Sequence, residues 1–63
     1  MEARIEKVIS KIEFRFAMEE TYWEQGKEAA AERKENQIEG MLETLSILTG
    51  KNYTIDNGKV VER

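Results

Sequence analysis

Apolar residues recur along the first fifty positions with the spacing of an amphipathic helix. At about 100° per residue, they gather on roughly one third of the helical circumference. We predict these positions as the core of an assembly: Ile5, Val8, Ile9, Ile12, Phe16, Trp23, Ala30, Ile38, Met41, Leu45 and Leu48. A stop follows at Gly50, because glycine suits the left-handed residue that ends a helix. The pattern therefore predicts helix over about residues 2–49.

The segment after Gly50 has the pattern of a β-hairpin. Short β-prone runs at 53–55 and 60–61 flank Asn57-Gly58, the pair that a type I′ turn prefers. This turn would set Asp56 opposite Lys59, Ile55 opposite Val60 and Tyr53 opposite Glu62. Tyr53, Ile55 and Val60 would then share a face. Because an isolated hairpin is marginal in water, it must pack on the helices or pair with another chain.

Residues 2–49 fit three arrangements. A turn at 25–27 gives two helices, and a continuous helix gives two chains packed antiparallel about Gly26 and Ala30. Both form the same apolar pairs: Ile5 with Leu48, Val8 with Leu45, Ile12 with Met41 and Trp23 with Ala30. In the third, a capping box at Asn36-Gln37-Ile38-Glu39 opens a separate last helix. The lack of a capping side chain between Tyr22 and Asn36, and the strong helix formers at 28–32, favour the continuous helix.

The length of the chain argues for self-association. It has 63 residues and no cysteine, histidine or proline, so it lacks the disulfides and common metal ligands that stabilise many small domains. We predict a mainly α fold: a long amphipathic helix or helical hairpin over about 2–49, then a short β-hairpin. Residues 1–50 would form an antiparallel homo-dimer or tetramer with Gly26 in its core, and 51–63 a hairpin tail.

Charge narrows the partners. Ten basic and thirteen acidic residues give a net charge of −3, which gives little support to nucleic-acid binding. Lys7, Lys11 and Arg15 recur at i, i+4, and so do Glu20, Glu24, Glu28 and Glu32, so the two ladders could meet between antiparallel helices. No apolar run approaches the ~18 residues of a membrane span, and no secretory signal is evident. We expect a soluble cytoplasmic protein with no membrane partner.

The residue types argue against catalysis. Without histidine or cysteine, the chain lacks the usual neutral-pH base and the usual zinc ligands. Ser10 and Ser46 have no histidine to activate them. We expect no enzyme activity, no catalytic residue, no metal and no cofactor.

A second apolar ridge is the strongest candidate site. Phe14, Met18 and Tyr22 recur at i, i+4, about half a turn from the main stripe. A helix that is apolar on two faces is either sandwiched or presents a binding surface. In one interpretation the β-hairpin or another helix covers the ridge. In the other, Phe14, Met18 and Tyr22 bind a partner together with Trp23 and Arg15.

Three functions follow. The favoured one is a small oligomeric adaptor or inhibitor of a larger protein, a type of regulator that is common among bacteriophage products. A second is an oligomer that holds a small anionic, nucleotide-like ligand between subunits. Arg4, Lys11, Arg15, Arg33 and Lys34 would supply its charge, and Phe14, Tyr22 or Trp23 would stack on a base. A third is a purely structural assembly module.

Overall fold

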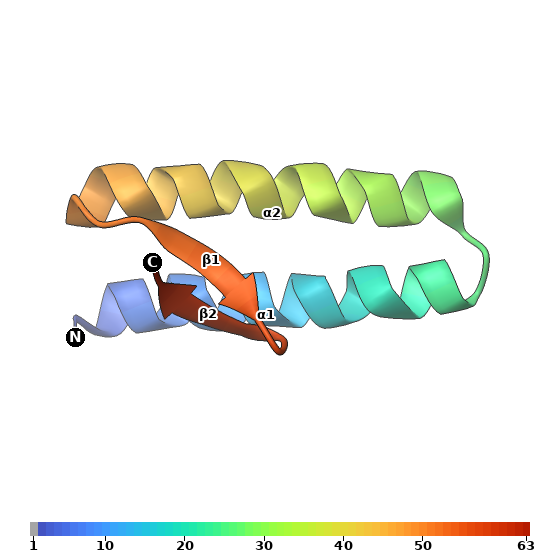
Figure 1. Cartoon of the computed structure of the whole chain (residues 1–63), viewed down its shortest axis with the longest axis horizontal. Helices are drawn as coiled ribbons and strands as arrows, with labels where there is room; N and C mark the ends of the chain where they lie inside the picture. The colour runs from blue at the N-terminus through green and yellow to red at the C-terminus, as the bar shows by residue number, and fades with distance from the viewer. Residues whose placement is uncertain (1) are drawn as a thin grey trace.

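The chain folds as two antiparallel helices with a β-hairpin laid across one face. The computed structural model describes residues 2–63: helix α1 is Ala3–Glu24, helix α2 is Glu28–Thr49, strand β1 is Tyr53–Asp56 and strand β2 is Lys59–Glu62. Its extents are 36 × 19 × 16 Å. The strands lie in front of the half that holds the start of α1 and the end of α2, and the half at the helix turn has no strand over it (Figure 1). The predicted mainly helical class with a terminal β-hairpin is confirmed.

The chain reverses direction at Gly26. Lys27 donates its backbone N–H to the carbonyl of Tyr22 at 2.8 Å, and Gly26 donates to the carbonyl of Trp23 at 3.1 Å. These two bonds are the Schellman pattern, which satisfies carbonyls at a helix end and needs a left-handed residue. Gly26 supplies that residue with a φ of 74°. Within one chain, the prediction of a continuous helix is therefore wrong, and the turn at 25–27 is correct.

The start of α2 shows why a helix can begin here without a capping side chain. Lys27 occupies the N-cap position and makes no side-chain capping bond. Residues 24–29 are all exposed, so water can satisfy the free N–H groups there. Asn36 lies inside α2, so the predicted break at the Asn36–Glu39 capping box is also wrong.

The β-hairpin has the predicted register. Tyr53 pairs with Glu62, Ile55 with Val60 and Asp56 with Lys59, in an antiparallel ladder. Asn57 and Gly58 have φ values of 51° and 75°, as a type I′ turn requires. Gly50 has a φ of 71° and ends α2 at the predicted stop.

The hairpin packs on the core between the helices. Ile12, Ile38 and Leu45 form its buried centre, and Tyr53, Ile55 and Val60 pack against it with their shared face. The backbone N–H of Val60 donates to Oε2 of Glu13 at 2.9 Å. Since Val60 is opposite Ile55 in a non-hydrogen-bonded pair, this N–H points away from β1, and Glu13 joins that edge to α1.

The remaining predicted core positions fall into two groups. Ile5, Val8, Ile9, Phe16 and Met41 are partly buried around the centre. Ala30 is half-buried, whereas its neighbour Ala31 is fully buried. Leu48 is 68% exposed and Trp23 45% exposed.

Two contacts predicted from the sequence are not found within the chain: a close helix crossing at Gly26 and a meeting of the two charge ladders. Gly26 lies in the turn, so it provides no close crossing of continuous helices. Among residues 2–63 the ion pairs are Arg4 with Glu2 at 2.9 Å and Lys51 with Glu62 at 3.5 Å. The predicted meeting of the basic and acidic ladders is therefore not a contact inside one chain.

Candidate interaction surface

A run of hollows follows the seam between the two helices. The first, of about 510 Å³, lies between the start of α1 and the end of α2 and includes Val8, Leu45 and Leu48 in its lining. The second, of about 560 Å³, lies further along the seam and includes Val8, Met41 and Thr44. Val8 lines both hollows, so they are neighbours along the seam.

The run of hollows continues toward the helix turn. Gln37 lines the second hollow and also a third, of about 220 Å³, which includes Tyr22 and Ala30. We call these three hollows the inter-helix groove. Tyr22 also lines a fourth hollow, of about 300 Å³, with Phe14 and Met18. The predicted apolar ridge is thus continuous with the end of the groove.

The inter-helix groove lies on the face of the helix pair that the hairpin leaves open. Its lining residues come from α1 and α2, apart from Glu2 just before α1. Glu13, which bonds the hairpin, and Lys11, which lines the groove, are two positions apart and so differ by about 200° around α1. The strands lie in front of the helix pair in Figure 1, and the bond from Val60 places Glu13 on that same side.

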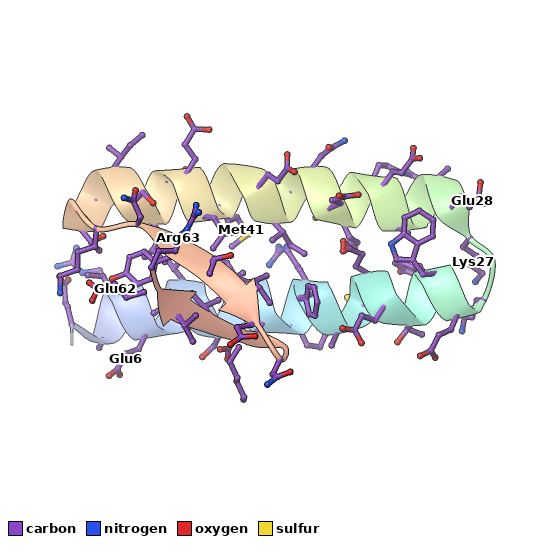
Figure 2. All side chains as sticks on the ribbon, viewed as in Figure 1. Glu6, Lys27, Glu28, Met41, Glu62 and Arg63 are labelled. Atoms are coloured by element: carbon purple, nitrogen blue, oxygen red, sulfur yellow. The ribbon has the colours of Figure 1, made fainter. Side chains whose placement is uncertain are left out.

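The floor of the inter-helix groove is apolar. Val8 comes from α1, and Met41, Leu45 and Leu48 come from α2. Figure 2 shows Met41 between the two helices, whereas Glu6 points away from α2. Leu45 is fully buried, but Leu48 is 68% exposed, so the floor deepens toward the core and opens toward solvent.

The rims of the inter-helix groove are basic. Six of the ten cationic residues of the chain line it, and they are Arg4, Lys7, Lys11, Arg15, Arg33 and Lys34. Only one of the thirteen acidic residues does so, and that residue, Glu2, pairs with Arg4. A concentration of one sign of charge around an apolar depression attracts ligands of the opposite sign.

The predicted partner-binding residues are distributed over this surface. Arg15 and Tyr22 line the inter-helix groove, and Phe14, Met18 and Tyr22 line the fourth hollow. Phe14 is 66% exposed, so neither the hairpin nor α2 covers this residue of the ridge, whereas Met18 and Tyr22 are partly buried. Trp23 lines none of these hollows. The ring of Tyr22 also has Nζ of Lys27 6.0 Å from its centroid.

Glu19 is an acidic residue inside the helix pair. It is only 8% exposed, and it occupies a position of the apolar stripe between Phe16 and Trp23. Burial, and then the nearby charges of Glu35, Glu20 and Glu39, raise the pKa of its carboxyl above the usual value. Because no cation within 4 Å pairs with it among residues 2–63, its ionised form destabilises the fold.

Part of this surface is not among the residues predicted from the sequence. The sequence pattern places Lys7 only in a charge ladder and Gln37 only in a capping box. The signal for Lys7 was present, because Arg4, Lys7, Lys11 and Arg15 lie on one flank of the predicted stripe. The contribution of Arg33 and Lys34 to the same face depends on the turn at Gly26, which brings α2 back along α1.

Other classes of site gain no support from the described residues. Over residues 2–63, no three His, Cys, Asp or Glu side chains are grouped so that they could hold a metal ion. Neither α1 nor α2 has an apolar segment long enough to cross a membrane. Comparisons with protein-family models, characterised proteins and solved structures gave no match to this chain.

Proposed function

We propose that the chain is a small protein-interaction module that acts as an adaptor or inhibitor of a larger protein, without catalysis of its own. The observation that carries this proposal is the inter-helix groove with its apolar floor. The β-hairpin covers the face of the helix pair that is opposite the inter-helix groove. The seam that remains open is suited to a partner.

The composition of the open surface supports a protein partner. Interface cores are enriched in aromatic residues, methionine and arginine. The groove and the fourth hollow together bring Phe14, Met18, Tyr22 and Met41 to one continuous surface with Arg15 at its edge. Apolar side chains at the bottom of depressions are also typical of residues that dominate binding energy, because a partner fully excludes water from them.

Site-specific photocrosslinking tests this proposal. A benzoylphenylalanine in place of Gln37 would sit in the groove, and one in place of Glu32 would sit on an exposed position of the same helix outside it. In lysate of the source cells, we expect a discrete protein adduct from position 37 and none from position 32. No adduct from position 37, or equal adducts from both positions, would contradict the proposal.

A second candidate is the binding of a small anionic ligand. The third hollow brings Tyr22 together with Arg33 and Lys34, which gives an aromatic ring and two cations for a nucleotide-like molecule. Its volume of about 220 Å³ is below the ~300 Å³ at which small-molecule pockets usually begin, so a ligand here would extend into the neighbouring part of the groove or be completed by a second subunit. A thermal-shift screen with nucleotides tests it, since a ligand of the folded state raises the Tm.

The predicted homo-dimer or tetramer remains a prediction. Turning at Gly26 lets one chain bury part of its own stripe, which weakens the original reason for self-association. Phe14, Trp23 and Ile47 still leave apolar area exposed. Light scattering against the monomer mass of 7.4 kDa measures this state directly. A sealed oligomer that gives no crosslinked partner would favour the alternative of a purely structural assembly module.

A further inference from the structure

The proposed protein-binding function can be taken one step further, to the chemistry of the partner. We infer that the occupant of the inter-helix groove is an amphipathic helix whose flanks are acidic. This inference rests on the proposed function. The shape of the groove, its apolar floor and the sign of charge on its rims all favour such a helix.

The shape suits a helix. Two antiparallel helices of 22 residues each present a long straight seam, which a third helix can follow along its length. The floor residues are spread along that seam, with Leu48 near one end, Met41 further along and Ala30 near the turn. A partner helix of about five turns, with apolar residues repeating at i, i+3, i+4 and i+7 along its length, would place anchors against each part of the floor.

Charge complementarity determines the flanks of that helix. Lys7, Lys11 and Arg15 follow the α1 rim, and Arg33 and Lys34 stand on the α2 rim nearer the turn. A helix lying between the rims would turn one flank to each of them. Carboxylates on one flank would meet the cations along α1, and carboxylates on the other would meet Arg33 and Lys34, since the lining from α2 over residues 36–48 is uncharged. Lysines there would face like charges across a partly desolvated seam, which is costly for binding.

A second copy of this chain fits the groove less well. Two grooves face to face would bring two sets of basic rims together. The acidic flank of α2 offers carboxylates, but its outward apolar residues are only Ala29 and Ile47, too few to fill the floor.

Nucleic acid and anionic membranes also fit less well. A phosphate backbone would satisfy the rims but leave Met41 and Leu48 without an apolar partner. A lipid surface is flat or convex, whereas these apolar side chains lie in a depression between the rims. Both classes therefore use only part of the surface that the acidic helix uses.

Three designed peptides test the inference. Each has 22 residues, the length of α1, with leucines at helical spacing and with Glu, Gln or Lys at all flanking positions. Labelled peptide is kept at low concentration and titrated with the whole chain by fluorescence anisotropy. We expect the Glu peptide to bind about tenfold more tightly than the Gln peptide at low salt, with the Lys peptide weakest. High salt should narrow these differences.

A pair of charge-matched protein variants shows where the peptide binds. Lys11→Glu reverses a rim charge, and Arg63→Glu makes the same change of net charge at an exposed position outside the groove. We expect Lys11→Glu to weaken Glu-peptide binding about fivefold and to improve Lys-peptide binding, whereas Arg63→Glu should change each affinity by less than about twofold. Circular dichroism of each variant confirms that it remains folded.

The outcomes separate this inference from the function on which it rests. Equal affinity for all three peptides, a preference for the Lys peptide, or no binding of any peptide would overturn the acidic helix as occupant. Tighter binding of single-stranded DNA or of anionic phosphatidylserine vesicles, with loss on Lys11→Glu, would overturn it in favour of that class. A position-37 protein adduct obtained alongside any of these results would keep the interaction module and reject only the acidic helix. Loss of both the adduct and the peptide binding would reject the two proposals together.

Discussion

The two faces of the helix pair have similar apolar residues in different roles. On one face the hairpin packs Tyr53, Ile55 and Val60 against the centre of the core, and Glu13 holds its outer strand. On the other face no segment from residues 2–63 covers the seam, and leucine and methionine line an open groove. The difference shows that apolar spacing on a helix does not distinguish residues that stabilise the fold from residues available to a partner. The position of the hairpin makes that distinction.

The same two faces differ in charge. The groove has six cations and one carboxylate in its lining, although the chain as a whole carries a net charge of −3. Glu13 lies on the hairpin side of α1, and burial and then the nearby charges of Glu35, Glu20 and Glu39 raise the pKa of the Glu19 carboxyl inside the helix pair. A net charge therefore describes neither face. An acidic chain can still present a cationic binding surface.

The largest expected effect is at the core centre, which lies between the two faces and supports both. Leu45 is fully buried at the core centre, so Leu45→Ala leaves a cavity and should lower the free energy of unfolding by about 3 kcal/mol. A chain of this size has on the order of 3–9 kcal/mol in total, so the variant should lose roughly one third to all of its stability. Urea unfolding followed by circular dichroism measures the change.

Ile47→Ala is the matched control on the same helix. Ile47 is 76% exposed, so its truncation should change the unfolding free energy by less than about 0.5 kcal/mol. Equal destabilisation by both variants would mean that Ile47 is buried in solution, as in an oligomer that covers the outer side of α2.

The next largest effect is at the turn that creates both faces. Gly26 has a φ of 74°, so Gly26→Ala should destabilise the chain by about 1–2 kcal/mol. Gly40 lies inside α2 with no atom near an added Cβ, so Gly40→Ala should stabilise it by up to about 1 kcal/mol. Thermal unfolding of both variants measures the contrast. If Gly26→Ala stabilised the chain as Gly40→Ala does, residues 3–49 would form a continuous helix in solution and the groove would not exist.

A smaller effect comes from Glu19, which lies between the helices. Glu19→Gln removes a buried charge with no cationic partner and should raise the free energy of unfolding by about 1 kcal/mol at about pH 7. Glu20→Gln, at an exposed neighbour, is the control and should have a smaller effect. Urea unfolding of both variants provides the comparison.

The pH dependence of this gain has a definite sign. The pKa of Glu19 is raised in the folded chain, so its destabilising effect is absent below the unfolded value and grows as pH rises through the folded one. The advantage of Glu19→Gln should therefore shrink toward zero as pH falls to about 4. A gain that persisted unchanged in acid would show that the charge of Glu19 is not its cause.

The turn and register of the hairpin could be predicted from the sequence because their signals are local, whereas its packing on the helices rather than on another chain could not. Asn57-Gly58 fixes the turn type, the turn fixes the register, and the register puts Tyr53, Ile55 and Val60 on one face. Gly50 likewise marks the end of α2 by its position after the last apolar residue. Each of these features depends on a few neighbouring residues, so no tertiary information is needed.

The helix turn is harder to predict from the sequence because two local signals conflict there. The sequence lacks a cap for the second helix, but Gly26 is suited to end the first. The Schellman bonds and solvent access at the exposed turn outweigh the missing cap. The groove is harder still to predict, because its α1 rim and its α2 rim come from segments that only the turn brings together. Phe14, Met18 and Tyr22 could be recognised from spacing alone, but their connection to Arg33 and Lys34 could not.

The division between the two faces can be tested by one paired measurement. Stability and Glu-peptide affinity are determined for Leu48→Ala in the groove and for Ile55→Ala in the hairpin. We predict that Leu48→Ala weakens peptide binding about fivefold with less than about 0.5 kcal/mol lost in stability. Ile55→Ala should lose about 1–2 kcal/mol and leave the affinity of the folded chain within about twofold. Unchanged affinity for Leu48→Ala, or a larger loss of affinity for Ile55→Ala, would contradict the account.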